Sequence, residues 1–205
     1  SYLDTASDEM ILEKYSLTLY GGCKGQINYD YNYGDVVFES QDASIAAVSQ
    51  NGIVEAKDKG TVNITVTDSD TGRQCICVVN VKEKISSKML ASKYKKLKKK
   101  YKEKKKWSDK NTDAYGNTGC YAYRTIVSEY LYGSDAISET HTSFKKIKVG
   151  DHIRITGLPH SVMVVKKKKN SVIVTEGNYN SSIHWGREIK KSYFKKNDFY
   201  VETWY

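Results

Sequence analysis

The sequence predicts two domains of different fold class, an all-β sandwich followed by an α+β domain. Residues 16–83 contain seven short runs rich in β-branched and aromatic residues, with turn residues between them. After residue 107 a helical pattern comes first and strand-like runs follow, which is an α+β order. A chain of 205 residues is long enough for both domains. We therefore divide it into a domain at 1–83, a helical linker at 84–106 and a domain at 107–205.

The expected strands of the first domain are short and closely spaced. Gly52, Gly60 and Gly72 each follow a polar residue and supply turns between them. Seven strands within about 70 residues are typical of a β-sandwich. The expected strands are residues 16–20, 26–29, 36–39, 46–49, 52–56, 62–67 and 75–81.

Part of this first domain resembles a known family. The run DASIAAVSQNGIVEAKDKGTVNITV has a small-residue turn at residues 44–46, an Asn-Gly turn at Gly52 and a Gly-Thr pair at Gly60 and Thr61. On these motifs residues 14–83 are similar to the group 2 bacterial Ig-like domain. The resemblance implies an Ig-like sandwich that serves as an extracellular spacer or adhesion module, without catalysis.

The basic net charge of +9 comes from one segment. Residues 84–110 hold 13 lysines and two acidic residues, whereas the rest of the chain holds 20 basic and 22 acidic residues. Apolar side chains recur there at helical spacing, and Ser86 or Ser87 is expected to cap the helix. The apolar stripe is expected to pack on a neighbouring domain, and it consists of Leu90, Tyr94, Leu97 and Tyr101.

The lysines leave open which partner the segment meets. They are suited to an anionic cell-wall polymer or a membrane surface. Nucleic acid is a third possibility, but no nucleic-acid fold follows the helix and we do not expect this partner. We expect a monomer.

The cysteine and hydropathy patterns exclude several classes of protein. No run of residues is long and apolar enough to span a membrane, and no signal peptide is recognisable. Cys75 and Cys77 are too close in sequence for a metal site and have no histidine near them, so we expect no metal and no cofactor. A disulfide from Cys23 to either of them and reduced, buried thiols are both compatible with the sequence.

The second domain carries the residues suited to catalysis. Cys120 follows Gly119 at the start of an expected helix, Cys120–Tyr132, where the helix dipole and unpaired amides favour a thiolate. His160 starts a later strand and is the natural base for this nucleophile. The helix is expected to end at Gly133.

A hairpin is expected to supply the third catalytic residue. If its turn centres near Lys168, His160 lies opposite Glu176, Val162 opposite Val174 and Val164 opposite Val172. Glu176 then shares a face with His160 and can orient the imidazole, and Asn178 lies on the same face. A slip of one residue would turn Glu176 away.

The same residues resemble a second family. The motifs are Gly119-Cys120, Val149-Gly150-Asp151, His160-Ser161-Val162 and EGNYN at 176–180. On their order, residues 110–205 are similar to the CHAP family, the cysteine, histidine-dependent amidohydrolases/peptidases of bacterial cell walls. The resemblance implies a papain-like fold and hydrolysis of amide bonds in peptidoglycan.

We therefore expect a secreted or surface-exposed bacterial cysteine hydrolase that acts on peptidoglycan. The expected catalytic residues are Cys120, His160, Glu176 and Asn178, and the expected substrate-binding residues are Tyr121, Trp185 and Arg187. Two alternatives stay open: Trp185 packed in the interior with Arg187 as a salt-bridge partner, and a non-catalytic wall-binding adhesin with a degenerate papain-like domain. His141 and His152 are expected on the surface or in loops. The sequence does not distinguish an amidase from an endopeptidase.

Overall fold

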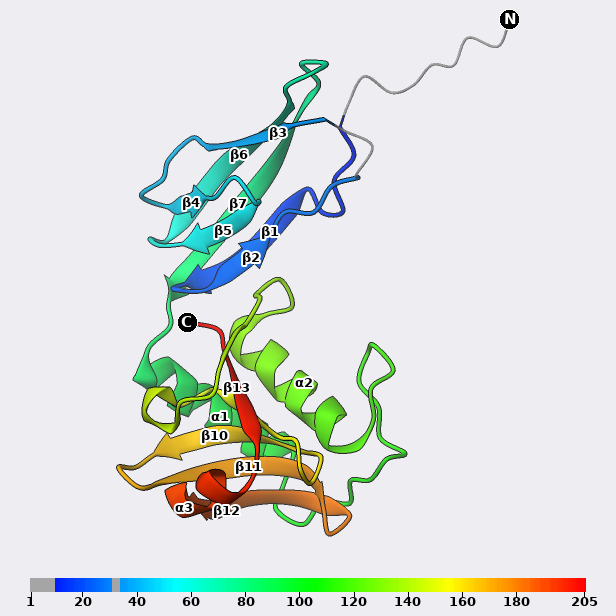
Figure 1. The fold of residues 1–205 in the computed structure, drawn as a ribbon, viewed down its shortest axis with the longest axis vertical. Coiled ribbons are helices and arrows are strands. Elements are labelled where there is room, and N and C mark those ends of the chain that lie inside the picture. The colour runs from blue at the N-terminus through cyan, green and yellow to red at the C-terminus, as the bar shows by residue number, and fades with distance from the viewer. Residues whose placement is uncertain (1–9, 31–33) are drawn as a thin grey trace, which may run out of the picture. The chain divides into compact units, whose positions relative to one another are not determined.

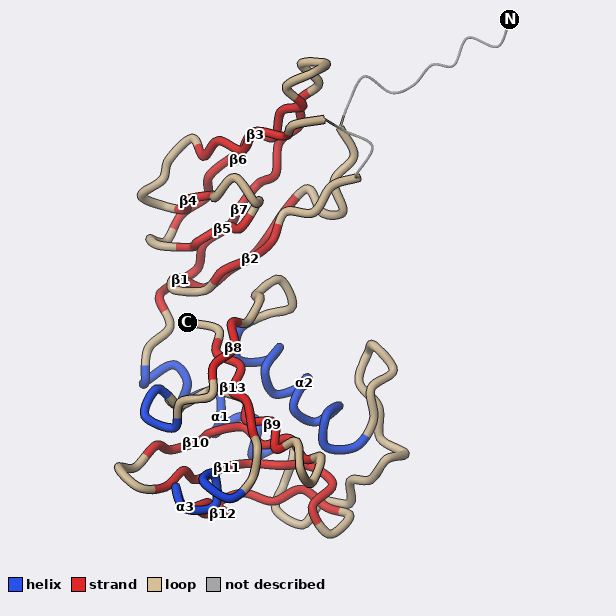
Figure 2. Tube along the Cα trace, in the orientation of Figure 1, coloured by secondary structure: helices blue, strands red, loops and turns tan. Residues whose placement is uncertain are grey.

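The protein divides into two compact units. The computed structural model describes residues 10–30 and 34–205, so residues 1–9 of the expected first domain lie outside the described residues. Unit 1 comprises the described residues up to Ile85 together with Ser134–Ile137 and Tyr205, and unit 2 comprises Ser86–Gly133 and Ser138–Trp204. Figure 2 shows that the helices lie in unit 2. In the described residues, no helix has the length and apolar character needed to cross a membrane.

Unit 1 is built from two β-sheets, shown in blue to green in Figure 1. One sheet has the order β1-β7-β6-β3, in which β1 runs parallel to β7 and the other pairs are antiparallel. The other sheet has the order β2-β5-β4 and is antiparallel. The strands are β1 Ser16–Gly21, β2 Lys24–Gln26, β3 Val36–Ser40, β4 Ala46–Val48, β5 Ile53–Ala56, β6 Gly60–Asp68 and β7 Gln74–Lys84.

The core of unit 1 follows from strand alternation. Every second residue of β6 and of β7 points inward, and the inward residues are apolar except Asp68 at the end of β6. These side chains include Val62, Ile64, Val66, Cys77 and Val79, all at most 5% exposed. The seven expected strands are thus present, with Cys77 acting as a small core residue.

One strand of unit 1 starts earlier than the sequence indicates. We expected residues 26–29, whereas β2 is Lys24–Gln26. Its partner β5 begins only after Gly52, whose φ of +76° belongs to a turn. The ladder therefore ends at the pair Gln26 and Ile53.

Unit 2 combines a six-stranded antiparallel sheet with helices. The strand order is β12-β11-β10-β9-β13-β8, and helix α2 packs on β10 and β11. Figure 1 shows α2 beside this sheet. The elements are α1 Ser87–Lys100, α2 Gly119–Tyr132, β8 Glu139–His141, η1 Phe144–Lys146, β9 His152–Ile155, β10 His160–Lys167, β11 Ser171–Tyr179, β12 Ser182–Lys190, α3 Lys191–Lys196 and β13 Phe199–Thr203.

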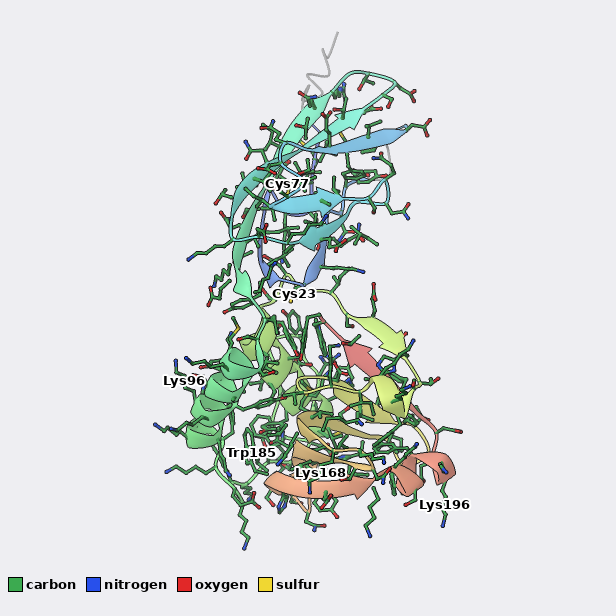
Figure 3. The ribbon with its side chains drawn as sticks, turned by 90° about the vertical axis from the view of Figure 1, so that its left-hand side faces the viewer. Cys23, Cys77, Lys96, Lys168, Trp185 and Lys196 are labelled. Carbon is green, nitrogen blue, oxygen red and sulfur yellow. The ribbon has the colours of Figure 1, made fainter. Side chains whose placement is uncertain are left out.

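The lysine-rich segment forms a helix that belongs to unit 2. The Ser86 hydroxyl caps α1 by accepting from the Met89 amide at 3.1 Å. The Tyr94 hydroxyl donates to the Val164 carbonyl at 2.9 Å, and Leu90 is 1% exposed. Figure 3 labels the exposed Lys96 on this helix. The segment that we expected to be a linker therefore contributes core side chains to the second unit.

The β10–β11 hairpin has a different register from the one expected. Val164 pairs with Val174, not with Val172, and the register shifts again between Val164 and Lys166. The turn is centred later than expected, because the Lys168 amide donates to the Ser171 carbonyl and only Lys169 and Asn170 lie between them. Near Val164 the slip is two residues, an even number, so inward and outward side chains keep their faces.

Removing a side chain from the α1 stripe should unfold unit 2 more easily. Leu90→Ala leaves a cavity in a fully buried position and is expected to lower the stability of unit 2 by about 2–5 kcal/mol. Urea unfolding followed by tryptophan fluorescence measures this, because Trp107, Trp185 and Trp204 all lie in unit 2. Lys96→Ala, on the exposed side of the same helix, is the matched control and should change little. Equal effects of the two substitutions would show that α1 is not part of the packed unit.

Candidate active site

The first component of the site is the start of helix α2. Gly119 has a φ of +58°, and a Cβ atom there would lie 2.3 Å from Asp109 Oδ1, so another residue would be strained and would displace the Asp109 carboxylate. The Trp107 indole donates to the Gly119 carbonyl at 2.9 Å and fixes this turn. The side chain of Thr118 makes no capping hydrogen bond. Half-buried Cys120 is thus held in the first turn of a helix whose N-terminal dipole favours an anion.

The second component is a histidine held by a buried carboxylate. His160 is the first residue of β10, and Glu176 lies on β11. The Nε2 atom of His160 is 2.9 Å from Glu176 Oε2, which leaves Nδ1 for the thiol. Arg187, on β12, donates through Nε and Nη2 to the two carboxylate oxygens of Glu176 at 2.6 Å. The Glu176 side chain is fully buried and carries two cationic partners.

The thiol and the imidazole shift each other's acidity in opposite directions. Burial raises the pKa of the Cys120 thiol, but hydrogen bonds from His160 and from the Ser161 amide, with the charges of His160 and Arg154, lower it to about 7. Burial lowers the pKa of the His160 imidazole, but hydrogen bonds to Cys120 and Glu176 raise it to about 9. The pair therefore exists as thiolate and imidazolium between these two values.

The carboxylate stays ionised although it is buried. Burial raises the pKa of Glu176, whereas hydrogen bonds from His160 and Arg187 lower it, and the net shift is downward. An ionised carboxylate behind the imidazole fixes its orientation and favours its protonated form. A nucleophile, a base and a carboxylate that orients the base are arranged in this way in enzymes that use nucleophilic catalysis.

Arg154 is a site residue that sequence reasoning missed. Its Nη1 atom lies 3.8 Å from Cys120 Sγ and 3.0 Å from the Ser161 hydroxyl. It lies on β9 and pairs with Ser161 across the ladder to β10. The sequence signal for Arg154 was the alternation of polar and apolar residues in its strand, which precedes the strand that His160 starts. That signal places Arg154 on a face but not beside Cys120.

The structure separates some of the residues that the sequence grouped. Asn178 has a φ of +56° and donates to Asp109 at 2.9 Å, so it supports the loop before α2 and makes no hydrogen bond with His160. Trp185 donates from its indole to the Tyr101 carbonyl and packs edge-on against Tyr94, beside α1 in Figure 3. This residue is part of the packing with α1.

The other two residues expected to bind substrate lie in the site. Arg187 is the salt-bridge partner of Glu176, which matches the alternative reading of this residue. The ring of Tyr121, next to the nucleophile, has the guanidinium of Arg154 5.8 Å from its centroid and that of Arg124 at 4.9 Å. The Tyr121 ring therefore packs beside the guanidinium of Arg154 and forms one side, or wall, of the space around it.

Our expectation for His152 is wrong. We expected a surface or loop residue, but His152 is 0% exposed in β9, because its strand is interior and its side chain pairs with Glu202 at 2.7 Å. Burial and the charge of Arg124 lower its pKa to about 4 against the opposing effect of Glu202, so it is neutral. Glu202 also forms a salt bridge with Arg124 at 2.6 Å. These three residues form an interior network beside the site.

The Gly-Asp motif has a structural role. The Tyr132 hydroxyl donates to the Gly150 carbonyl at 2.9 Å, which ties the end of α2 to the chain before β9. Asp151 is fully buried and accepts a hydrogen bond from the Lys148 amide. Within the described part of the chain, no group of three or more His, Cys, Asp or Glu side chains is placed to hold a metal ion.

Comparison with known proteins identifies the first unit. Residues 15–79 match the family described as bacterial Ig-like domain (group 2). This stretch is a bacterial Ig-like domain. The match extends over the two sheets of unit 1 up to Val79 in β7.

Two similar solved structures come from an S-layer protein. Domains 4 and 5 of the S-layer protein SbsC are 19% identical over 35% of this chain and 50% of that chain, with a TM-score of 0.29. Domains 5-6 of the same protein are 13% identical over 88% of this chain and 95% of that chain, with a TM-score of 0.31. This chain thus spans half the length of the first of them. No curated protein is similar enough to count as a match.

The low pKa of Cys120 should appear in its alkylation rate. At about pH 6 iodoacetamide should modify Cys120 far faster than an ordinary thiol, with a rate that rises through pH 7. Cys77 is the internal control, because burial raises its pKa to about 11 and it should stay unmodified. Mass spectrometry of the modified peptides measures both. Equal labelling of the two cysteines, or an inert Cys120, would contradict the assigned ion pair.

The carboxylate should control the imidazole. Glu176→Gln removes the negative charge that raises the pKa of His160, so the upper limit of the thiolate–imidazolium range should fall below 9. A histidine NMR titration measures the midpoint. Glu188→Gln is the matched control, because Glu188 lies on β12 and is bound to Lys168 and Ser171 instead. An unchanged midpoint in Glu176→Gln would show that the carboxylate does not act on His160.

Proposed function

We propose that unit 2 is a CHAP-like cysteine hydrolase of papain-like fold that cleaves amide bonds in peptidoglycan peptides. The observation that supports this most strongly is the convergence of Cys120, His160 and Glu176 from a helix start and two strands. Their charges favour a thiolate near neutral pH. A structural cysteine needs neither a lowered pKa nor a base.

The chemistry follows from the geometry of the three groups. The Cys120 thiolate attacks the amide carbonyl, and the tetrahedral oxyanion is placed to accept a hydrogen bond from the Cys120 amide at the start of α2. The His160 imidazolium donates its proton to the leaving nitrogen as the C–N bond breaks, and a thioester remains. His160, now neutral, takes a proton from water, and the hydroxide attacks the thioester carbonyl. The C–S bond breaks, the acid product leaves, and the Cys120 thiolate and the His160 imidazolium are restored.

Three residues act through these groups. Glu176 holds the His160 ring and stabilises its positive charge, and Arg187 holds Glu176. Asn178 supports the loop that carries Asp109, next to Gly119. Glu176, Arg187 and Asn178 are positioning residues in this scheme.

The cell wall is the substrate that the rest of the chain favours. The bacterial Ig-like domain at residues 15–79 supports a secreted or cell-surface protein in which unit 1 is a spacer or adhesion module. The lysines of α1 other than Lys93 are exposed and are suited to anionic wall polymers. The motif order around Cys120 and His160 supports peptidoglycan as the substrate.

A second function, a wall-binding adhesin without catalysis, is favoured by the same Ig-like domain. It requires unit 2 to bind wall fragments with an inert Cys120. The two functions differ in one measurable property, because only the hydrolase creates new chain ends.

Purified peptidoglycan tests the proposal. The protein should release fragments, and Cys120→Ala should reduce release by at least about 1,000-fold while thermal unfolding is unchanged. Cys75→Ala is the matched control, because Cys75 lies on β7 in the other unit and should leave activity intact. Mass spectrometry of the new termini separates an amidase, which frees the peptide from the sugar, from an endopeptidase, which cuts within the peptide. Equal release by Cys120→Ala would refute Cys120 as the nucleophile, and no release by the wild type would refute the hydrolase and leave the adhesin.

A further inference from the structure

Arg154 is the cation beside the nucleophile that the proposed reaction does not use. Both of its described hydrogen bonds, to Cys120 Sγ and to the Ser161 hydroxyl, come from Nη1. Its Nε and Nη2 donors have no hydrogen-bond acceptor among residues 10–30 and 34–205. A guanidinium offers these two donors as a planar fork that matches a carboxylate.

The carboxylates near the site are already engaged by other groups. Glu176 is bound to His160 and Arg187, and Glu202 is bound to Arg124. Asp109 accepts from Asn178. In the described part of the chain, Arg154 forms no salt bridge with Asp or Glu, so the thiolate is its one anionic neighbour.

The reaction removes that neighbour. When Cys120 is acylated, its sulfur becomes part of a neutral thioester, and Arg154 is left half-buried with its charge unbalanced. A half-buried cation without an anion is unfavourable, whereas a charge-assisted hydrogen bond to a carboxylate is strong. A substrate that brings its own carboxylate would restore the balance.

We propose that Arg154, with Tyr121 as its wall, forms a subsite for a substrate carboxylate next to the scissile amide. The Tyr121 ring lies 5.8 Å from the guanidinium and limits where the fork can point. The substrate class is therefore a peptide that carries a free carboxylate on the residue at or beside the cleaved bond. This inference rests on the proposed hydrolase function of Cys120.

Two alkylating reagents of nearly equal size test the subsite without knowledge of the substrate. Iodoacetate carries a carboxylate on the reacting carbon, and iodoacetamide carries a neutral amide in the same place. The ratio of their rates at Cys120 cancels the amount of thiolate, since both reagents need it. Peptide mass spectrometry separates Cys120 from the other three cysteines.

Arg154→Gln should lower the iodoacetate-to-iodoacetamide rate ratio roughly tenfold, because it removes a charge-assisted contact. The rate ratio of Arg154→Lys should lie between those of the wild type and Arg154→Gln, since lysine keeps the charge without the planar pair of donors. Arg73→Gln, in unit 1, is the matched control and should keep the wild-type ratio. An unchanged ratio in Arg154→Gln, with both reagents slowed equally, would overturn the subsite and leave Arg154 acting only on the thiolate.

A measurement on the unaltered protein guards against a variant that fails to fold. Excess acetate should slow the alkylation of Cys120 by iodoacetamide, whereas acetamide or chloride at the same concentration should not. Equal alkylation rates in acetate, acetamide and chloride would overturn the subsite. Fast alkylation by iodoacetamide in the same experiment would still support Cys120 as a reactive nucleophile. If iodoacetamide itself fails to label Cys120 at about pH 6, the hydrolase proposal fails and the subsite with it.

Discussion

The buried carboxylate of Glu176 is the constraint on which the site depends. An ionised carboxylate with no exposure to water is costly unless cations and hydrogen bonds surround it. Arg187 supplies a bidentate contact from β12, and His160 supplies the second from β10. Because both strands flank β11 in the sheet, the ladder itself brings these charges together. The raised pKa of His160, and through it the thiolate of Cys120, follow from this cluster.

The turn before α2 is the second requirement, because it brings the sulfur to the imidazole. Gly119 adopts a left-handed backbone conformation that is strained for most other residues, and a Cβ atom there would displace the Asp109 carboxylate. Asn178 holds Asp109, so the end of β11 supports the loop before α2. A site that needs positions accurate to a fraction of an ångström is thus built on rigid elements with hydrogen-bonded supports.

Local patterns in the sequence predict much of this arrangement. The α1 stripe and its Ser86 cap, the end of α2 at Gly133 and the seven strands of unit 1 all follow from periodicity and turn chemistry. The shared face of His160 and Glu176 was predicted from an incorrect register. The faces were unaffected because near Val164 the register differs by an even number of residues. Three roles depend on tertiary contacts, which no local pattern contains: Arg154 beside the sulfur, Trp185 beside α1 and His152 in the interior.

The titration of the Cys120 thiolate tests the central claim most directly. The ultraviolet absorbance of thiolates is recorded against pH for the wild type and for Cys120→Ala, and the difference isolates this one sulfur. The account predicts a step with a midpoint near pH 7, and a midpoint displaced upward toward an ordinary thiol in His160→Gln. A wild-type midpoint at the ordinary value of about 8.5, or one that His160→Gln leaves in place, would contradict the ion pair.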